Sequence, residues 1–340
     1  MLNQEEMMQK QQEQNGNEIP TEKDTVSPVL KDTVAFFCAD CKKAYGDLLE
    51  FAGIRPGMKV FCPDFLSETF AEQIAEKGGI PVFIDAEYET WNMDPKALEC
   101  AFDRYENTGI AVVTYLNGVP ARMEELLEVV EKHQAVLIED LTYGFGTTYR
   151  GKALGSFGSF AIKPFSLSEE TGALVFAREK PEALPKDRYA KVQDPFDMWE
   201  GLFYGCEENR AEHAQKRRAG YFSGCMRIEE LLKEEAVWFQ KNSNLPDLTD
   251  GEAVGFLTEE GLDPKMRKQL EEQFGSELRL PMPLHMRERF LLHDFVVNSN
   301  GFRCHCGPGV FVGKDECYVE VSGELYRRAV IIPLTRKRSV

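Results

Sequence analysis

The chain has 340 residues, and 40 Lys and Arg against 57 Asp and Glu give it a formal net charge of −17. Hydrophobic residues make up 43% of the chain and charged residues 29%, proportions that suit a globular protein with a sizeable core. So acidic a balance argues against broad binding to nucleic acids or to anionic membranes. No apolar run of about 18 residues predicts a membrane-spanning helix.

The N-terminal segment and the cysteines both favour a cytoplasmic protein. Residues 1–28 are rich in Gln, Glu and Asn, so they bury too little apolar surface to become ordered, and we expect a mobile tail. This segment also lacks the apolar centre of a signal peptide. The nine cysteines are odd in number and do not follow the pattern of a small disulfide scaffold, which indicates reduced thiols.

Residues 29–185 show a regular alternation of apolar runs and amphipathic stretches. The runs predict strands at 59–62, 81–85, 110–115, 135–140, 159–162 and 173–177, and the stretches predict helices at 40–53, 66–77, 94–104 and 121–133. Strands that are apolar throughout are typical of a sheet buried on both faces. We therefore predict an α/β domain with three layers, α/β/α, around a mostly parallel sheet.

Residues 186–340 show a different sequence pattern. Charged segments of helical length dominate at first, for example at 207–218 and 228–240. Short runs typical of strands return after residue 288. We therefore expect a helical connection followed by a smaller C-terminal α+β domain.

The residues that follow the predicted strands are the best candidates for chemistry, because ligands bind outside the carboxyl ends of parallel strands. Asp140 ends the most apolar strand, where its carboxylate can hold a cationic nitrogen or a metal ion, or can cap the next turn. Lys163 follows the next strand. A desolvated lysine there has a lowered pKa and suits Schiff-base chemistry, whereas an ordinary surface lysine is the alternative.

A series of short motifs runs in order from residue 53 to residue 178. The motifs lie at 53–63, 79–85, 91–98, 117–123, 136–140, 148–158 and 172–175. In order and spacing, this series resembles the DegT/DnrJ/StrS family of aminotransferases that depend on pyridoxal 5'-phosphate (PLP), many of which act on nucleotide-linked keto sugars. The resemblance implies the fold-type-I PLP-transferase architecture, a small-molecule substrate and a homodimer whose active sites are shared between subunits.

The resemblance also assigns roles to individual residues. Asp140 matches the aspartate that pairs with the pyridine nitrogen of PLP, where a carboxylate keeps that nitrogen protonated. Lys163 is the candidate for the lysine that forms the Schiff base. Phe65 lies in the segment that brings an aromatic ring near the cofactor, although simple core packing explains it equally well.

Several positions depart from the family pattern. Tyr143 stands where the family usually has Gln. If Pro164 is the family proline, the lysine position is Ser166 and the Schiff base is lost; if the strand is shortened, Lys163 is the lysine. The turn that normally holds the phosphate falls near Asp40, Cys41 and Lys42, where backbone amides and Lys42 can bind an anion but the Asp40 charge opposes it.

Three functions remain open on the sequence. The first is a PLP-dependent aminotransferase that acts on a keto sugar or a similar ketone. The second is a catalytically degenerate relative that keeps the fold and serves as a binding or partner subunit. The third is an unrelated α/β enzyme with Asp140 as a metal ligand. A zinc site built from Cys38, Cys41, Cys304 and Cys306 would join two predicted domains, so we expect no metal site.

Overall fold

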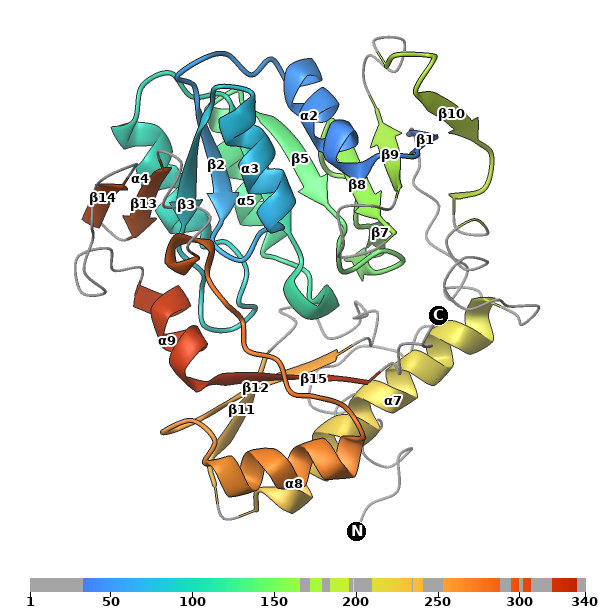
Figure 1. Cartoon of the computed structure of the whole chain (residues 1–340), viewed down its shortest axis with the longest axis vertical. Helices are drawn as coiled ribbons and strands as arrows, with labels where there is room; N and C mark the ends of the chain where they lie inside the picture. The colour runs from blue at the N-terminus through green and yellow to red at the C-terminus, as the bar shows by residue number, and fades with distance from the viewer. Residues whose placement is uncertain are drawn as a thin grey trace.

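The computed structural model describes residues 33–165, 172–178, 184–195, 198, 210–233, 235–240, 253–287, 295–299, 302–306 and 320–334. Within these residues, a large α/β/α unit lies above a smaller unit of strands and helices (Figure 1). The three-layer fold predicted from the sequence is confirmed. The expected mobile tail at 1–28 lies outside the described residues. None of the described helices combines the length and the apolar character needed to cross a membrane.

The centre of the large unit is a sheet that has ten strands within the described residues. They are β1 (Val34–Cys38), β2 (Lys59–Pro63), β3 (Ile80–Ile84), β4 (Ile110–Thr114), β5 (Val136–Asp140), β8 (Phe160–Pro164), β9 (Ala173–Ala177), β10 (Tyr189–Val192), β13 (Phe295–Ser299) and β14 (Phe302–Cys306). Their order is β10-β1-β9-β8-β5-β4-β2-β3-β13-β14. Neighbours from β8 to β13 are parallel, so their carboxyl ends meet at one edge, which faces the smaller unit (Figure 1).

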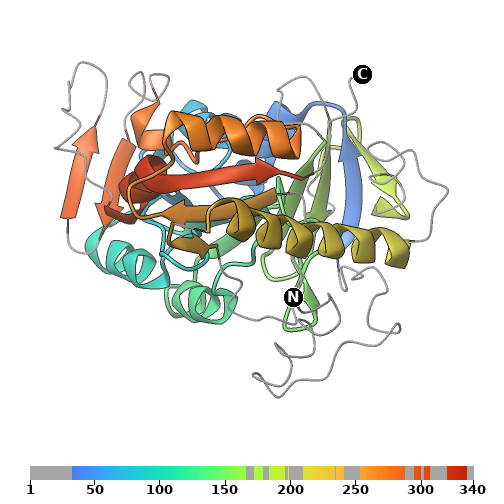
Figure 2. The same ribbon diagram turned by 90° about the horizontal axis from the view of Figure 1, so that it is seen from below.

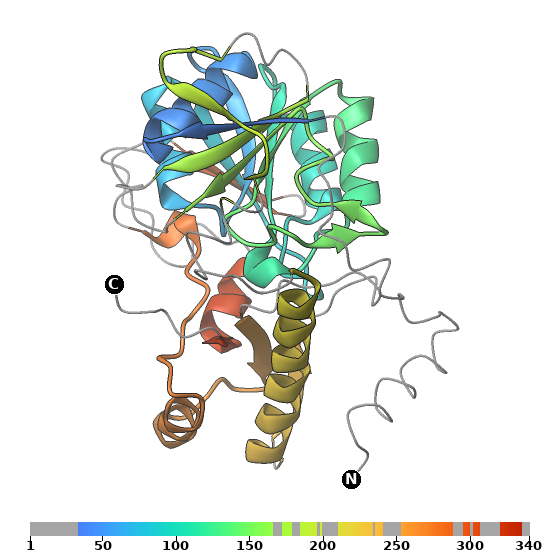
Figure 3. The same ribbon diagram turned by 90° about the vertical axis from the view of Figure 1, so that its right-hand side faces the viewer.

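Helices cover both faces of this sheet (Figure 3). On one face lie α2 (Cys41–Phe51) and α3 (Glu68–Glu76), and on the other lie α4 (Pro95–Arg104) and α5 (Met123–Lys132). Successive strand residues alternate between the two faces. Ile138 and Ile162 pack in the cluster under α2 and α3, whereas Leu137 and Ala161 pack in the cluster under α4 and α5.

Preferred capping residues mark the helix ends in the large unit. The Asp94 carboxylate accepts the backbone N–H of Lys96, and Pro95 occupies the first position of α4. Gly53 and Gly78 follow α2 and α3 with φ angles of +87° and +81°. A residue with a side chain is strained in that left-handed conformation, whereas glycine adopts it without strain and can therefore end both helices.

The smaller unit has its own sheet and its own core. Its strands β11 (Val237–Phe239), β12 (Ala253–Thr258) and β15 (Ala329–Pro333) lie in that order. The helices α7 (Arg210–Leu231) and α8 (Pro264–Phe274) pack against this sheet in one cluster that includes Ile228, Leu270 and Phe256 (Figure 2). The opposite face contacts α9 (Glu320–Arg328) and the carboxyl edge of the large sheet, since Leu325 and Trp91 share one cluster.

Two expectations about the second half of the chain need correction. The helix expected at 228–240 is wrong beyond Leu231, because Val237–Phe239 forms β11 and pairs with β12. A β-branched residue followed by two aromatic residues favours a strand over the charged helix that surrounds it. In addition, β10, β13 and β14 join the large sheet although they lie beyond residue 185. Strand pairing is long-range, so the local pattern does not reveal which sheet a short strand joins.

The Gln240 side chain links the two units. It is 2% exposed, and its amide donates to the backbone carbonyls of Thr90 and Leu116 at 2.5 and 2.9 Å. Its Oε1 accepts from Asn117 Nδ2 at 2.8 Å. The neighbouring Gly255 leaves room for this contact, because a Cβ there would lie 2.8 Å from Gln240 Oε1. One buried amide therefore satisfies polar groups from the loops that follow β3 and β4.

Replacing Gln240 with leucine is expected to lower the free energy of unfolding by about 2–4 kcal/mol, because buried carbonyls and an amide lose their partners. Urea unfolding followed by circular dichroism measures the change. Gln269→Leu on the exposed side of α8 is the matched control and is expected to have little effect. A loss of less than about 1 kcal/mol for Gln240→Leu would show that this contact does not hold the two units together.

Candidate active site

The carboxyl edge of the large sheet brings several predicted site residues to the junction with the smaller unit. Phe65 follows β2 and Tyr143 follows β5, and both pack, partly buried, against the apolar cluster that contains Leu116 and Leu325. Asp140 is the last residue of β5. The large unit therefore brings two aromatic rings to the edge at which β5 ends with the buried Asp140 carboxylate.

Asp140 is fully buried. Its Oδ1 accepts the backbone N–H and the hydroxyl of Thr142 at 2.8 and 2.6 Å, so the carboxylate also caps the turn after β5. Its Oδ2 lies 3.5 Å from the Tyr45 hydroxyl. Burial raises the pKa of Asp140 to about 6, although the bonds from Thr142 and the charge of Lys163 act in the opposite direction. A cation beside Oδ2 would stabilise the ionised carboxylate.

Lys163 lies on β8, next to β5, and its side chain is nearly as buried as that of Asp140. Its ammonium donates to the backbone carbonyl of Thr142 at 2.8 Å. Lys163 pairs with Leu174 across β9, and both belong to the sheet face that packs under α4 and α5. The Lys163 side chain therefore leaves the sheet on the face opposite to that of Asp140, and its ammonium reaches the carbonyl of Thr142, two residues beyond Asp140.

Glu139 and Asp140 are adjacent in sequence but serve different purposes. Glu139 is fully buried on the α4–α5 face. Its carboxylate accepts the Tyr115 hydroxyl at 2.5 Å and the backbone N–H groups of Gly155, Phe157 and Gly158 at 2.6, 2.7 and 2.6 Å. The three bonds from backbone N–H groups fix the loop that leads into β8, the strand that carries Lys163.

Two other carboxylates at strand ends already accept hydrogen bonds from other segments of the chain. Asp64, after β2, accepts the backbone N–H of His285 and lies 2.7 Å from its Nδ1. Asp85, after β3, accepts the backbone N–H groups of Val321 and Ser322 at 3.1 and 2.9 Å and thereby caps α9. Of these strand-end carboxylates, Asp140 is the one whose bonds leave an oxygen only weakly engaged.

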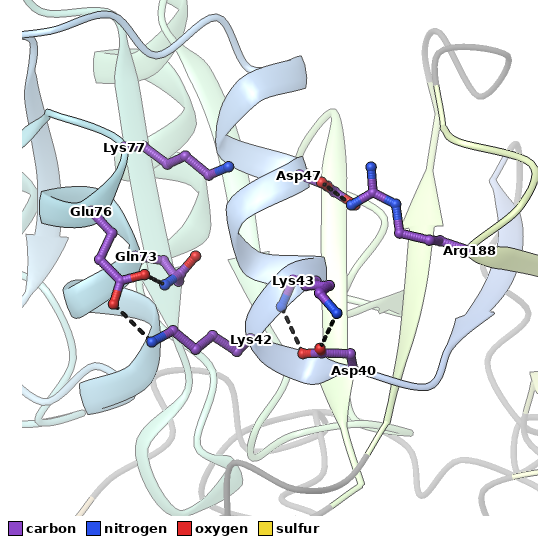
Figure 4. A pocket seen from close by; sticks show the side chains of 8 residues that line it. All are labelled: Asp40, Lys42, Lys43, Asp47, Gln73, Glu76, Lys77 and Arg188. Atoms are coloured by element: carbon purple, nitrogen blue, oxygen red, sulfur yellow. Dashed lines mark hydrogen bonds and ion pairs between the residues drawn. The ribbon is translucent and has the colours of Figure 1, made fainter.

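The N-terminus of α2 is occupied by a carboxylate of the chain. Asp40 accepts the backbone N–H of Lys43 and also forms an ion pair with its ammonium, both at 2.9 Å (Figure 4). Lys42, a predicted phosphate ligand, forms an ion pair with Glu76 at 2.7 Å. Both lysines line a shallow cavity of about 300 Å³ between α2 and α3. Charges of both signs alternate around this cavity.

Cys41, the other residue predicted near the phosphate, is the first residue of α2 and is buried. Burial and the Asp140 charge raise the pKa of its thiol to about 12, so the thiol stays protonated at neutral pH. Ser166, the alternative position for the family lysine, lies outside the described residues. Within the described ranges, no group of three or more His, Cys, Asp or Glu side chains is placed to hold a metal ion.

The residues present fit the ring nitrogen of PLP at one end of the expected site, but at the other end they differ from the phosphate-binding turn that the family usually has. A buried carboxylate with an elevated pKa and a weakly engaged oxygen suits a protonated ring nitrogen. At the phosphate end, the amide of Lys43 at the helix N-terminus is already bound by Asp40. Asp140 is therefore the residue that would hold the cofactor, and α2 does not offer the usual free N-terminus.

Sequence reasoning did not identify Tyr45 as a neighbour of Asp140. The two residues are 95 positions apart, and only the packing of α2 against the end of β5 brings the phenol to the carboxylate. The sequence carries no motif that marks this tyrosine, because an aromatic residue on the buried side of a helix is usually part of the core.

Comparisons with known proteins agree with this fold. The model of the DegT/DnrJ/EryC1/StrS aminotransferase family matches residues 2–180. The UDP-2-acetamido-2-deoxy-3-oxo-D-glucuronate aminotransferase of Pseudomonas aeruginosa is 28% identical over 157 residues, which are 46% of this chain and 43% of that protein. More generally, the chain covers 39%, 36% and 52% of the length of three other curated relatives.

Solved structures share the fold at low sequence identity. A DegT DnrJ EryC1 StrS aminotransferase from Brucella abortus superimposes with a TM-score of 0.62 at 18% identity, covering 95% of this chain and 88% of that one. A GDP-4-keto-6-deoxymannose-3-dehydratase with a trapped PLP-glutamate geminal diamine gives a TM-score of 0.63 at 14% identity, covering 88% and 83%.

These matches confirm the fold-type-I architecture and, for the family, the expected cofactor, pyridoxal 5'-phosphate. The family match extends over more than half of the chain and ends near β9, the last strand that the motif series reaches. The protein described here therefore belongs to the DegT/DnrJ/EryC1/StrS aminotransferase family.

Proposed function

We propose that this protein is a PLP-dependent aminotransferase that acts on a keto sugar or a similar ketone. The observation that carries the proposal is the buried Asp140 carboxylate at the junction of the two units, with Oδ1 held by Thr142 and Oδ2 weakly engaged. The names of the relatives support the substrate class, since one acts on a 3-oxo sugar nucleotide and another on a 4-keto sugar nucleotide.

In this proposal, Asp140 keeps a proton on the ring nitrogen of the cofactor. PLP, when bound, supplies an electron sink that stabilises negative charge on the substrate carbon. The burial of Asp140 strengthens its attraction to a cationic nitrogen, because it removes competing solvent. Phe65 and Tyr143 supply the partly buried aromatic walls and keep water from this end of the site.

Lys163 supplies the amine in the same proposal. Its ammonium donates to the Thr142 carbonyl, two residues beyond Asp140. In this role the amine would hold the cofactor and could carry a proton between substrate atoms. Binding therefore requires Lys163 to leave Thr142, lose its proton and turn toward the face on which Asp140 lies.

Replacing Lys163 with alanine is expected to abolish the visible absorption band that forms when PLP is added to the purified protein. The reason is that an amine is needed to bind PLP covalently. Lys268→Ala on the exposed surface of α8, where the side chain is 77% exposed, is the matched control and should leave the band intact. A band that persists in Lys163→Ala would remove Lys163 from this role without affecting the fold.

A second function has a specific observation in its favour. The Asp40 carboxylate occupies the N-terminus of α2, and Lys42 is paired with Glu76, so a phosphate would meet a like charge there. These contacts favour a catalytically degenerate relative that keeps the fold and acts as a binding or partner subunit. The same titration separates the two functions, because the degenerate protein would develop no band with PLP at any concentration.

We further propose a cytoplasmic homodimer. Cys38, Cys41, Cys62, Cys100 and Cys225 are free thiols in the described part of the chain, which suits a reducing compartment. The dimer follows from the family resemblance, in which two subunits share each active site. Light scattering on the purified protein tests it, and a mass near 38.7 kDa would indicate a monomer.

A further inference from the structure

We propose that Tyr45 is a positioning residue for Asp140, with its phenol holding Oδ2 while Thr142 holds Oδ1. The inference rests on the proposed function, because it assigns Tyr45 a part in presenting the carboxylate to the cofactor. It also makes a separate claim about the protein without cofactor, namely that the phenol interacts with the Asp140 carboxylate.

The Tyr45 ring is held in a fixed place. It lies in α2 and is 1% exposed. It stacks on Phe70 of α3, with ring centroids 4.4 Å apart and an interplanar angle of 25°. Stacking between two buried rings leaves the phenol little freedom to swing away. The hydroxyl is therefore presented to the end of β5 by the packing of two helices.

The two oxygens of Asp140 are engaged unequally. Oδ1 accepts two short bonds from Thr142, at 2.8 and 2.6 Å. Oδ2 has the Tyr45 hydroxyl at 3.5 Å, which is at the long limit of a hydrogen bond. A carboxylate oxygen can accept two donors. Tyr45 therefore orients Oδ2 and leaves it able to accept a second, shorter bond from a ring N–H.

Tyrosine suits this task chemically. Burial and the charge of Asp140 raise the pKa of the Tyr45 hydroxyl well above its usual range. The phenol therefore keeps its proton at neutral pH and acts as a donor to the carboxylate. Ser67 and Thr142 also interact with the hydroxyl. These polar neighbours distinguish Tyr45 from an aromatic residue that only fills the core.

Tyr45→Phe tests the proposal, since it removes the hydroxyl and keeps the ring that stacks on Phe70. We expect the variant to bind PLP roughly 3- to 10-fold more weakly, the effect of losing one hydrogen bond to a charged group. The matched control is Tyr189→Phe, a buried tyrosine whose hydroxyl donates to Asp47 at 3.0 Å instead. That variant should bind PLP like the unmodified protein.

A second measurement uses the protein without cofactor. The stability difference between the parent and Asp140→Asn, followed by urea unfolding across pH, reports the titration of Asp140. The Tyr45 hydroxyl lowers the pKa of Asp140. In the Tyr45→Phe background, the midpoint of this difference should therefore move to higher pH, whereas Tyr189→Phe should leave it in place.

The outcomes are distinct. Weaker PLP binding together with the raised midpoint supports the proposal. Unchanged or tighter binding in Tyr45→Phe would overturn it, and tighter binding would show that the phenol competes with the cofactor for Asp140. If the parent binds no PLP, the proposed function fails. The midpoint in the Tyr45→Phe background then decides the contact between Tyr45 and Asp140: an unmoved midpoint would overturn that contact, and a raised midpoint would support it.

Discussion

Replacing Glu139 with glutamine is expected to lower the free energy of unfolding by about 3–5 kcal/mol. Four donors converge on this fully buried carboxylate, and three of them are backbone N–H groups of the loop that leads into β8. One oxygen of Glu139 accepts from Phe157 and Gly158, and the other accepts from Tyr115 and Gly155. A glutamine NH2 in place of either oxygen therefore leaves at least one backbone N–H without an acceptor. Burial raises the pKa of Glu139, but the four bonds act against that shift and hold the group in place.

Urea unfolding at pH 7 measures this loss. Glu128→Gln on the exposed side of α5 is the matched control, because it removes the same charge without touching the core. We expect the control to change stability by less than about 0.5 kcal/mol. The loop that precedes β8 should also become sensitive to proteolysis in Glu139→Gln. A variant as stable as its control would show that these bonds contribute nothing to the fold.

Replacing the next residue, Asp140, with asparagine is expected to have the opposite effect on the protein without cofactor. The pKa of this carboxyl is raised to about 6 in the folded state, against 3.8 for the free group. Ionised Asp140 therefore destabilises the folded protein at pH 7 by about 2–3 kcal/mol. In Asp140→Asn, the amide oxygen still accepts from Thr142, and the amide NH2 can donate to the Tyr45 hydroxyl. The hydroxyl can turn to accept this bond, whereas the backbone N–H groups around Glu139 cannot turn away from an NH2.

The sign of the pH dependence follows from the direction of the shift. An acid whose pKa rises on folding costs nothing below about pH 3.8, and its cost grows through the interval between 3.8 and 6 and is complete above it. The gain from Asp140→Asn should therefore vanish near pH 4. Asp103→Asn, an exposed carboxylate on α4, is the control. A gain that stays constant across this range would contradict the titration of Asp140.

The same substitution should weaken PLP binding by about 10- to 100-fold, because the ring nitrogen loses its charged partner. Asp140 would then be a residue that costs stability in the empty protein and is retained for its function. Thermal unfolding with and without PLP measures both effects on one sample. PLP binding as tight in Asp140→Asn as in the parent would argue that the cofactor does not contact this residue.

The sequence was sufficient for those parts of the fold that depend on local patterns. The runs at 59–62 and 173–177 are strands with nearly the predicted bounds, and the helix predicted at 94–104 is α4, which begins after the Asp94 cap. Strands buried on both faces appear in the sequence as continuous apolar runs, and a capped helix start appears as a residue such as Asp followed by Pro. The segment 228–240 was misjudged because three strand residues, Val237–Phe239, are flanked by charged residues typical of helices.

The site could be predicted only in part. The position of Asp140 at the end of a parallel strand follows from the pattern, and so does its proximity to Lys163 on the next strand. The faces on which the two side chains leave the sheet follow from register, since Asp140 is paired with Ile162 rather than with Lys163. The contact of Tyr45 with Asp140 depends on helix packing, which no motif encodes. Asp40 is a preferred N-cap residue, so its bond to the N-terminus of α2 does have a sequence signal.

Peptide mapping after borohydride reduction tests the central claim most directly. The full-length protein is incubated with PLP, reduced with borohydride and digested, and the peptide that carries a phosphopyridoxyl group is identified by mass spectrometry. The account predicts modification of Lys163 at one group per chain, and a strongly reduced yield in Asp140→Asn. No modification, or modification of exposed lysines in proportion to their exposure, would contradict the assignment of Asp140 and Lys163 to a PLP site.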